Sequence, residues 1–97
     1  MSPPPPFKFR LYVAGNLANS AQAAANLALF CRDYLPGRHQ IEIVDVLREP
    51  KRALAEGVFL APTLVKLSPA PICKIIGTLG ETPPLLRTCG LEGRPAQ

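Results

Sequence analysis

The chain has 97 residues, a formal net charge of +4 and an apolar fraction of 47%. A chain of this length forms one domain, and this apolar content supports a packed core rather than wholesale disorder. No apolar run approaches the roughly 20 residues that a membrane-spanning helix needs, and the N-terminus lacks the basic and apolar regions of a signal peptide. We therefore expect a cytoplasmic protein with no membrane partner.

The 11 lysine and arginine residues are scattered along the sequence, and the aromatic residues are 4 phenylalanines and 2 tyrosines. Nucleic-acid binding is typically indicated by a dense basic stripe interleaved with aromatic side chains. We therefore expect no nucleic-acid partner and interpret the basic residues as an ordinary solvated surface. Attraction to an acidic protein surface stays open.

Residues 1–6 form a proline-rich run, which favours an extended conformation, and we expect a disordered leader there. The folded domain is predicted over 7–91, and 92–97 form a flexible tail. Apolar and polar residues alternate over Phe7–Val13, which is the period of two expected of a strand.

An alanine-rich helix follows, with Asn19 or Ser20 as its N-cap and Pro36-Gly37 as its end. A second strand is predicted over Gln40–Leu47, in which Asp45 should lie at the strand's end and face solvent, or pair with a cation. Strand, helix and strand then form a right-handed βαβ unit with parallel strands. The apolar residues of the helix recur at spacings of three and four and form one stripe: Ala24, Leu27, Ala28, Cys31 and Leu35.

The second half of the chain begins with a short helix over Pro50–Glu56. Strands are predicted over Thr63–Leu67 and Ile72–Ile76, and because the turn between them is short they should be antiparallel. A last short helix is predicted over Pro83–Thr88, with Thr82 as its N-cap. The order β-α-β-α-β-β-α with a mixed sheet is the thioredoxin-like α/β plan.

The position that carries chemistry in this plan holds no cysteine. Redox-active members place C-x-x-C at the start of the first helix, because a helix N-terminus stabilises the attacking thiolate. Here that segment is Ala14–Ser20, and His39 lies at the other end of the helix from Ser20. We therefore expect a protein that is not an enzyme and has no catalytic residue, cofactor or metal.

The three cysteines, Cys31, Cys73 and Cys89, show neither a disulfide framework nor paired zinc ligands and are interpreted as packing residues. A thiol- or glutathione-type protein of the thioredoxin superfamily remains the alternative function, and it would have to use one of them. Ala61-Pro62-Thr63 occupies the place of the cis-proline of this plan, where we expect an architectural role.

Several segments together resemble the KaiB family of small clock proteins, in order from about Phe7 to Leu86. These segments are Leu11-Tyr12-Val13-Ala14-Gly15-Asn16, Asn19-Ser20, Val44-Asp45-Val46-Leu47, Pro62-Thr63-Leu64 and Lys74-Ile75-Ile76-Gly77. The resemblance implies a regulatory protein that binds KaiC, a hexameric ATPase, and that helps to sequester KaiA. A histidine kinase with a similar sensor domain is a further implied partner.

The resemblance also implies fold switching between a monomeric thioredoxin-like state and a tetramer-type fold in which the C-terminal half rearranges. The prolines Pro62, Pro69 and Pro71 lie in the half that switches and are candidates for it. Pro83-Pro84 suits the first turn of a helix but removes two donors from a strand, so we expect the thioredoxin-like state to dominate.

Two basic positions that the family associates with KaiC docking are occupied here by Gln22 and Cys73. The remaining candidates for partner contact are Lys51, Arg52 and Lys66, which flank the second helix and the third strand. Plain surface charge is an equally good interpretation of each of them.

Overall fold

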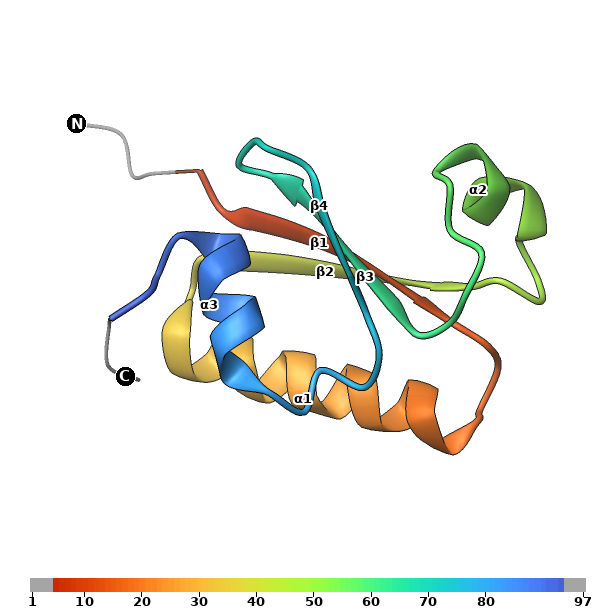
Figure 1. The fold of residues 1–97 in the computed structure, drawn as a ribbon, viewed down its shortest axis with the longest axis horizontal. Coiled ribbons are helices and arrows are strands. Elements are labelled where there is room, and N and C mark those ends of the chain that lie inside the picture. The colour runs from red at the N-terminus through yellow and green to blue at the C-terminus, as the bar shows by residue number, and fades with distance from the viewer. Residues whose placement is uncertain (1–4, 94–97) are drawn as a thin grey trace.

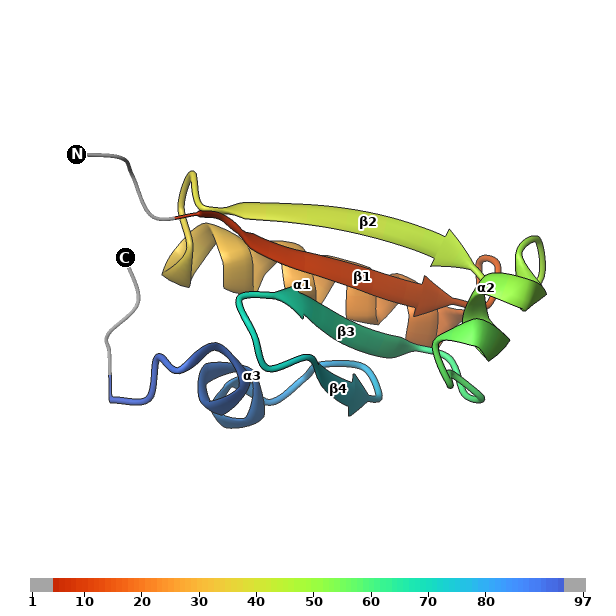
Figure 2. The same cartoon turned by 90° about the horizontal axis from the view of Figure 1, so that it is seen from above.

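The computed structural model describes residues 5–93, within which four strands form one mixed sheet in the order β2-β1-β3-β4. β1 runs parallel to β2 and antiparallel to β3, and β3 runs antiparallel to β4. Figures 1 and 2 show the twisted sheet with α1 lying along one face. The predicted thioredoxin-like order is confirmed: β1 Phe7–Val13, α1 Ala18–Tyr34, β2 His39–Asp45, α2 Pro50–Ala55, β3 Thr63–Ser68, β4 Cys73–Ile76 and α3 Thr82–Cys89.

Both faces of the central strand β1 are covered. Phe9 and Leu11 point into the larger core, which also contains Leu27 of α1 and Leu85 of α3. Tyr12 points to the other face and packs in a smaller cluster with Val44, Ala53, Val58 and Val65. Helices α1 and α3 therefore cover one face of the sheet, and the short α2 covers one end of the other face.

Helix α1 begins two or three residues earlier than the capping pattern predicted. Its N-cap is Leu17, which makes no side-chain cap hydrogen bond. Ser20 is buried, and its hydroxyl oxygen accepts a hydrogen bond from the Ala14 N–H at 3.0 Å. The predicted cap residue therefore joins the helix to the end of β1 and does not start the helix.

The predicted apolar stripe of α1 is partly wrong. Ala28 is exposed, whereas Ala23 and Phe30 are buried beside Leu27 and Cys31. Alanine carries little apolar surface, so its spacing in an alanine-rich helix fixes the buried face poorly, and the larger Phe30 side chain takes the place against the sheet.

Asp45 ends β2, as expected, but its side chain is half-buried and lies 4.0 Å from Arg48 Nε rather than open to solvent. Its Oδ1 accepts hydrogen bonds from the Gly15 N–H at 3.1 Å and the Leu47 N–H at 2.9 Å. The carboxylate satisfies backbone donors of two loops, which ends β2 at Asp45 and not at Leu47.

The last two elements each start one residue away from the prediction. β4 begins at Cys73, and α3 begins at Thr82 with Glu81 at its N-cap, so Thr82 is not the cap. Gly90 ends α3 in the left-handed region at φ 68°, where glycine carries no steric penalty. The predicted leader and tail fall mainly on 1–4 and 94–97, which lie outside the described residues.

Candidate functional site

The loop between β1 and α1, where redox-active proteins of this fold carry their thiols, is held by hydrogen bonds from its backbone amides to side-chain oxygens. The Gly15 and Ala14 amides donate to Asp45 and Ser20. His39 begins β2, and its Nδ1 lies 2.8 Å from the Leu35 carbonyl oxygen, a contact in which Nδ1 must donate. Because Leu35 follows the C-terminal end of α1, the structure does not bring His39 and Ser20 together.

All three cysteines are free thiols. Cys31 and Cys89 are buried, and burial raises the pKa of the Cys31 thiol to about 12 and that of the Cys89 thiol to about 11. Cys73 is half-buried at the start of β4. A thiolate is the reactive form of cysteine, so the environments of Cys31 and Cys89 oppose thiol chemistry at neutral pH.

The three candidate prolines lie at two places around β3 and β4. Pro62 is buried just before β3, its peptide bond with Ala61 is cis, and its carbonyl accepts a hydrogen bond from the Gly77 N–H at 3.0 Å. Pro69 and Pro71 are exposed in the turn between β3 and β4, and both are also preceded by cis bonds. Pro62 therefore belongs to the end of the sheet near α2, and the other two belong to the opposite end.

The three basic candidates lie in three different environments. Lys51 is exposed on α2. Arg52 donates to Glu42 at 2.9 Å and to Glu49 at 3.4 Å, so its guanidinium is engaged within the chain. Lys66 is only 3% exposed on β3, which removes it from the surface available to a partner in this conformation.

Arg52 belongs to a network of charges that crosses the sheet. Arg10 on β1 donates to Glu42 on β2 at 2.7 Å and to Glu56, at the end of α2, at 2.9 Å. The buried Tyr12 hydroxyl donates to the same Oε1 of Glu56 at 2.6 Å. Arg10 and Tyr12 lie two residues apart on one face of a strand, a spacing that could have revealed this site in the sequence.

The network lowers the pKa of two of its carboxyl groups, those of Glu42 and Glu56. Hydrogen bonds from Arg10 and then Arg52 lower the pKa of Glu42. Burial acts to raise the pKa of Glu56, but the hydrogen bonds from Tyr12 and Arg10 outweigh it and lower that pKa. Both carboxylates are therefore stabilised as anions, and the network is intact at neutral pH.

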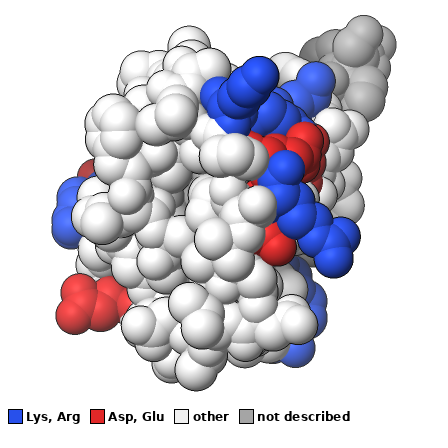
Figure 3. Space-filling view, turned by 90° about the vertical axis from the view of Figure 1, so that its right-hand side faces the viewer, with Lys and Arg blue, Asp and Glu red and all other residues white. Residues whose placement is uncertain are grey.

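A groove of about 110 Å³ lies between the segment 57–60, which follows α2, and residues of β3 and β4, and we name it the α2-end groove. Several of its side chains are apolar and solvent-exposed, with Phe59 at 79%, Leu60 at 61% and Ile76 at 64%. Figure 3 shows this end of the molecule as a broad uncharged area, with charged side chains at both edges and more of them on the right. The residues that line the groove are Gly57, Val58, Phe59, Leu60, Thr63, Lys74 and Ile76.

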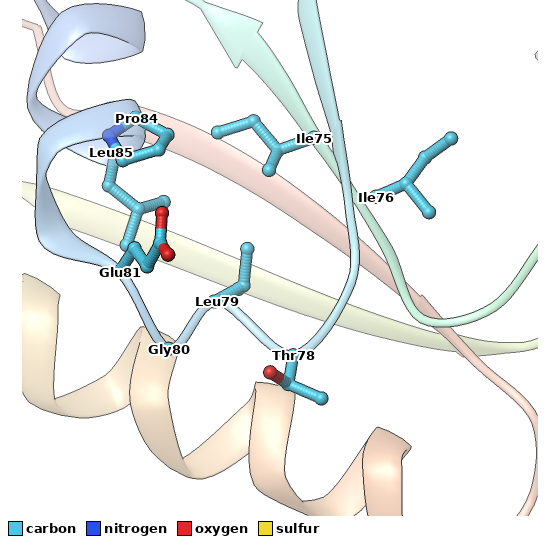
Figure 4. A pocket seen from close by; sticks show the side chains of 8 residues that line it. All are labelled: Ile75, Ile76, Thr78, Leu79, Gly80, Glu81, Pro84 and Leu85. Carbon is cyan, nitrogen blue, oxygen red and sulfur yellow. The ribbon is translucent and has the colours of Figure 1, made fainter.

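A second hollow, of about 260 Å³, lies between β4 and α3. Figure 4 shows Ile75 and Leu79 on the side facing Pro84 of α3, whereas Thr78 and Ile76 point away. Its lining is mostly aliphatic with one carboxylate, Glu81, and offers no arrangement of acid, base or nucleophile.

The charges of the described residues do not form a basic stripe. Among them four arginines pair with carboxylates, at 2.7 to 4.0 Å: Arg10, Arg32, Arg48 and Arg52. No group of three metal-ligating side chains comes together within 5–93. In the same part of the chain, every helix is too short or too polar to span a bilayer.

Comparison with known proteins identifies a family from the sequence and a fold from the structure. The family model of the KaiB domain matches residues 10–89. The circadian clock protein KaiB3 of Synechocystis sp. is 42% identical over 77 residues, covering 79% of this chain and 76% of that protein. The circadian clock oscillator protein KaiB of Prochlorococcus marinus (strain MIT 9313) is 37% identical over 81 residues, covering 84% and 68%.

Among solved structures, the N-terminal domain of Synechococcus elongatus SasA has a TM-score of 0.76 at 13% identity, covering 97% of this chain and 91% of that chain. Chloroplastic thioredoxin z has a TM-score of 0.73 at 17% identity, covering 90% and 79%. These likenesses show the thioredoxin-like fold, and the sequence matches show the family. The chain belongs to the KaiB family.

Proposed function

We propose that this chain is a non-enzymatic regulator that binds a KaiC-like hexameric ATPase through the α2-end groove and the adjoining face of α2. Membership of the KaiB family supports the class of partner. The single observation that carries the choice of surface is the group of exposed apolar side chains at this end, with Phe59 the most exposed of the large apolar residues.

Exposed apolar side chains gathered at one place are unusual on a protein that has no partner. Leu54 on α2 is 63% exposed and adds to Phe59, Leu60 and Ile76 at the same end of the sheet. Fully burying one such side chain contributes about 1.5–3 kcal/mol, so a partner that covers two or three of them gains a substantial part of a binding energy. Aromatic residues such as Phe59 are frequent anchors in interfaces of this kind.

Lys51 is the basic candidate best placed to meet an acidic partner surface. It is exposed on α2 beside Leu54, whereas Arg52 is held by Glu42 and Glu49. A charge at the rim of an interface mainly steers association and adds modest affinity. We therefore assign the main binding energy to the apolar side chains and a smaller electrostatic contribution to Lys51.

A KaiA-like protein and the sensor domain of a histidine kinase are further candidates in the same signalling system. The shared fold with the SasA N-terminal domain supports competition between this chain and such a sensor for one partner. In this proposal the chain acts as a monomer in the thioredoxin-like state, and the tetramer-type fold is an alternative state of the same sequence. The buried thiols give the thiol-type alternative no support.

The proposal is tested by co-elution of the purified chain with a cyanobacterial KaiC hexamer in size-exclusion chromatography. The variant Phe59→Ser removes the most exposed apolar side chain of the groove, and we expect it to weaken binding about tenfold or more. Ile72→Ser is the matched control, because Ile72 is 64% exposed but lies at the opposite end of β4, beside the turn. A chain that does not co-elute, or equal binding by both variants, contradicts the proposal.

A further inference from the structure

Glu56 joins three elements at the C-terminal end of α2. Its Oε1 accepts hydrogen bonds from the Tyr12 hydroxyl at 2.6 Å and Arg10 Nη1 at 2.9 Å, both on β1. Its main-chain carbonyl accepts a hydrogen bond from Nζ of Lys74, on β4, at 2.6 Å. One residue therefore ties the end of α2 to the first strand and to the last strand of the sheet.

The segment that follows Glu56 turns sharply before it reaches the exposed apolar residues. Gly57 has a φ of 72°, and a side chain there would come within 3.1 Å of Lys74 Nζ. The Gly57 N–H donates to the Leu54 carbonyl at 3.0 Å, and the Val58 N–H donates to the Ala53 carbonyl at 2.8 Å. Because Val58 is buried, the path over 56–58 fixes the direction in which the chain leaves toward Phe59.

We propose that Glu56 is a positioning residue for the α2-end groove, holding 57–60 so that Phe59 and Leu60 are presented to the partner. The inference rests on the proposed function for what the groove binds. Glu56 acts from beneath the surface: its side chain is 22% exposed, and the residues that line the groove begin at Gly57. Arg10 donates to the Glu56 carboxylate, and the Lys74 ammonium donates to the Glu56 carbonyl. Each hydrogen bond involves an ionised group, so both are stronger than neutral hydrogen bonds.

Loss of the carboxylate affects the two β1 partners differently. Arg10 keeps its contact with Glu42, whereas the Tyr12 hydroxyl belongs to a residue only 1% exposed and loses the acceptor that the structure gives it. Glutamine keeps an acceptor oxygen at the same distance from the backbone, whereas alanine keeps none. Glu56→Ala therefore removes the acceptor together with the long side chain, whereas Glu56→Gln keeps both and removes only the negative charge.

The first test is residue-resolved hydrogen exchange by NMR on the free chain. We expect Glu56→Ala to accelerate exchange of the Gly57 and Val58 amides about tenfold. The Leu11 amide, in the centre of the sheet, should be unchanged, and Glu56→Gln should restore most of the protection. Glu92→Ala is the matched control, since Glu92 is exposed beyond α3. Unchanged exchange at Gly57 and Val58, or equal acceleration at Leu11, overturns the inference.

The second test measures the affinity of the same variants for a purified cyanobacterial KaiC hexamer. We expect about tenfold weaker binding by Glu56→Ala, near-normal binding by Glu56→Gln and no change in Glu92→Ala. Wild-type affinity in Glu56→Ala overturns the positioning role. A wild-type chain that fails to bind KaiC instead contradicts the proposed function, and the exchange measurement then decides by itself whether Glu56 holds 57–58.

Discussion

Replacing Tyr12 with phenylalanine removes one hydroxyl from the centre of the charge network. The ring is buried and remains in place, so the change creates no cavity and isolates the 2.6 Å hydrogen bond to Glu56. A hydrogen bond to a charged group contributes about 1.5–3 kcal/mol to stability. Since Glu56 keeps its contact with Arg10 and is partly exposed, we expect the lower end of this range.

Urea and thermal unfolding at pH 7 measure the effect of Tyr12→Phe. For a domain of this size, each 1 kcal/mol of lost stability lowers Tm by roughly 4–8 °C. Tyr34→Phe is the matched control, because Tyr34 stacks on Phe30 and its hydroxyl makes no hydrogen bond within the described residues. We expect the control to unfold within about 0.5 kcal/mol of wild type.

The same pair of proteins gives a pH dependence whose sign follows from the lowered pKa of Glu56. A carboxylate whose pKa is depressed in the folded state contributes stability that is present above its unfolded pKa, near 4.5, and is lost as the pH falls through its folded pKa. The difference between wild type and Tyr12→Phe should therefore shrink below about pH 4.5. Equal stability at pH 7, or a difference that grows in acid, would refute this account of the network.

Three further outcomes are expected. Leu64→Ala, which truncates a fully buried side chain of the larger core, should lower the free energy of unfolding in urea by about 2–5 kcal/mol, whereas Ile72→Ala should change it by less than about 0.5 kcal/mol. In a thiol-titration time course on the native chain, Cys73 should react first, and Cys31 and Cys89 should react only on addition of denaturant, so fast labelling of all three contradicts their burial. Backbone NMR shifts should be helical over 82–89 in a monomer; strand shifts there, or a predominantly tetrameric species, would mean that the other fold dominates.

The order of elements could be predicted from the sequence because its signals are local. Alternation over Phe7–Val13, Pro36-Gly37 after α1 and Pro50 at the start of α2 each act within a few residues. Helix starts were less predictable: Ser20 is a good capping residue by type, but its hydroxyl accepts a hydrogen bond from Ala14, just after β1, instead. That contact exists only after the strand and the helix have packed together.

The candidate site was less predictable because it depends on contacts between distant residues. Lys66 was expected at the surface, yet β3 lies between β1 and β4 and is buried over Thr63–Lys66, so alternation does not reveal an outward face. Arg52 was a candidate for partner contact or for plain surface charge, and its ion pair with Glu42, ten positions away, was not evident from the sequence. The role of Glu56 could not be predicted from the sequence, because its partners on β1 and β4 come close only in the folded chain.

The central claim is that the α2 end of the molecule docks on a KaiC-like ATPase, and a footprint of the complex tests it most directly. Hydrogen–deuterium exchange of the wild-type chain, with and without a saturating cyanobacterial KaiC hexamer, compares peptides that cover 50–61 with peptides that cover the turn at 69–72. We predict added protection over 50–61 and none in the turn. Protection confined to the turn, or to the α1 face of the sheet, would contradict the proposed docking surface.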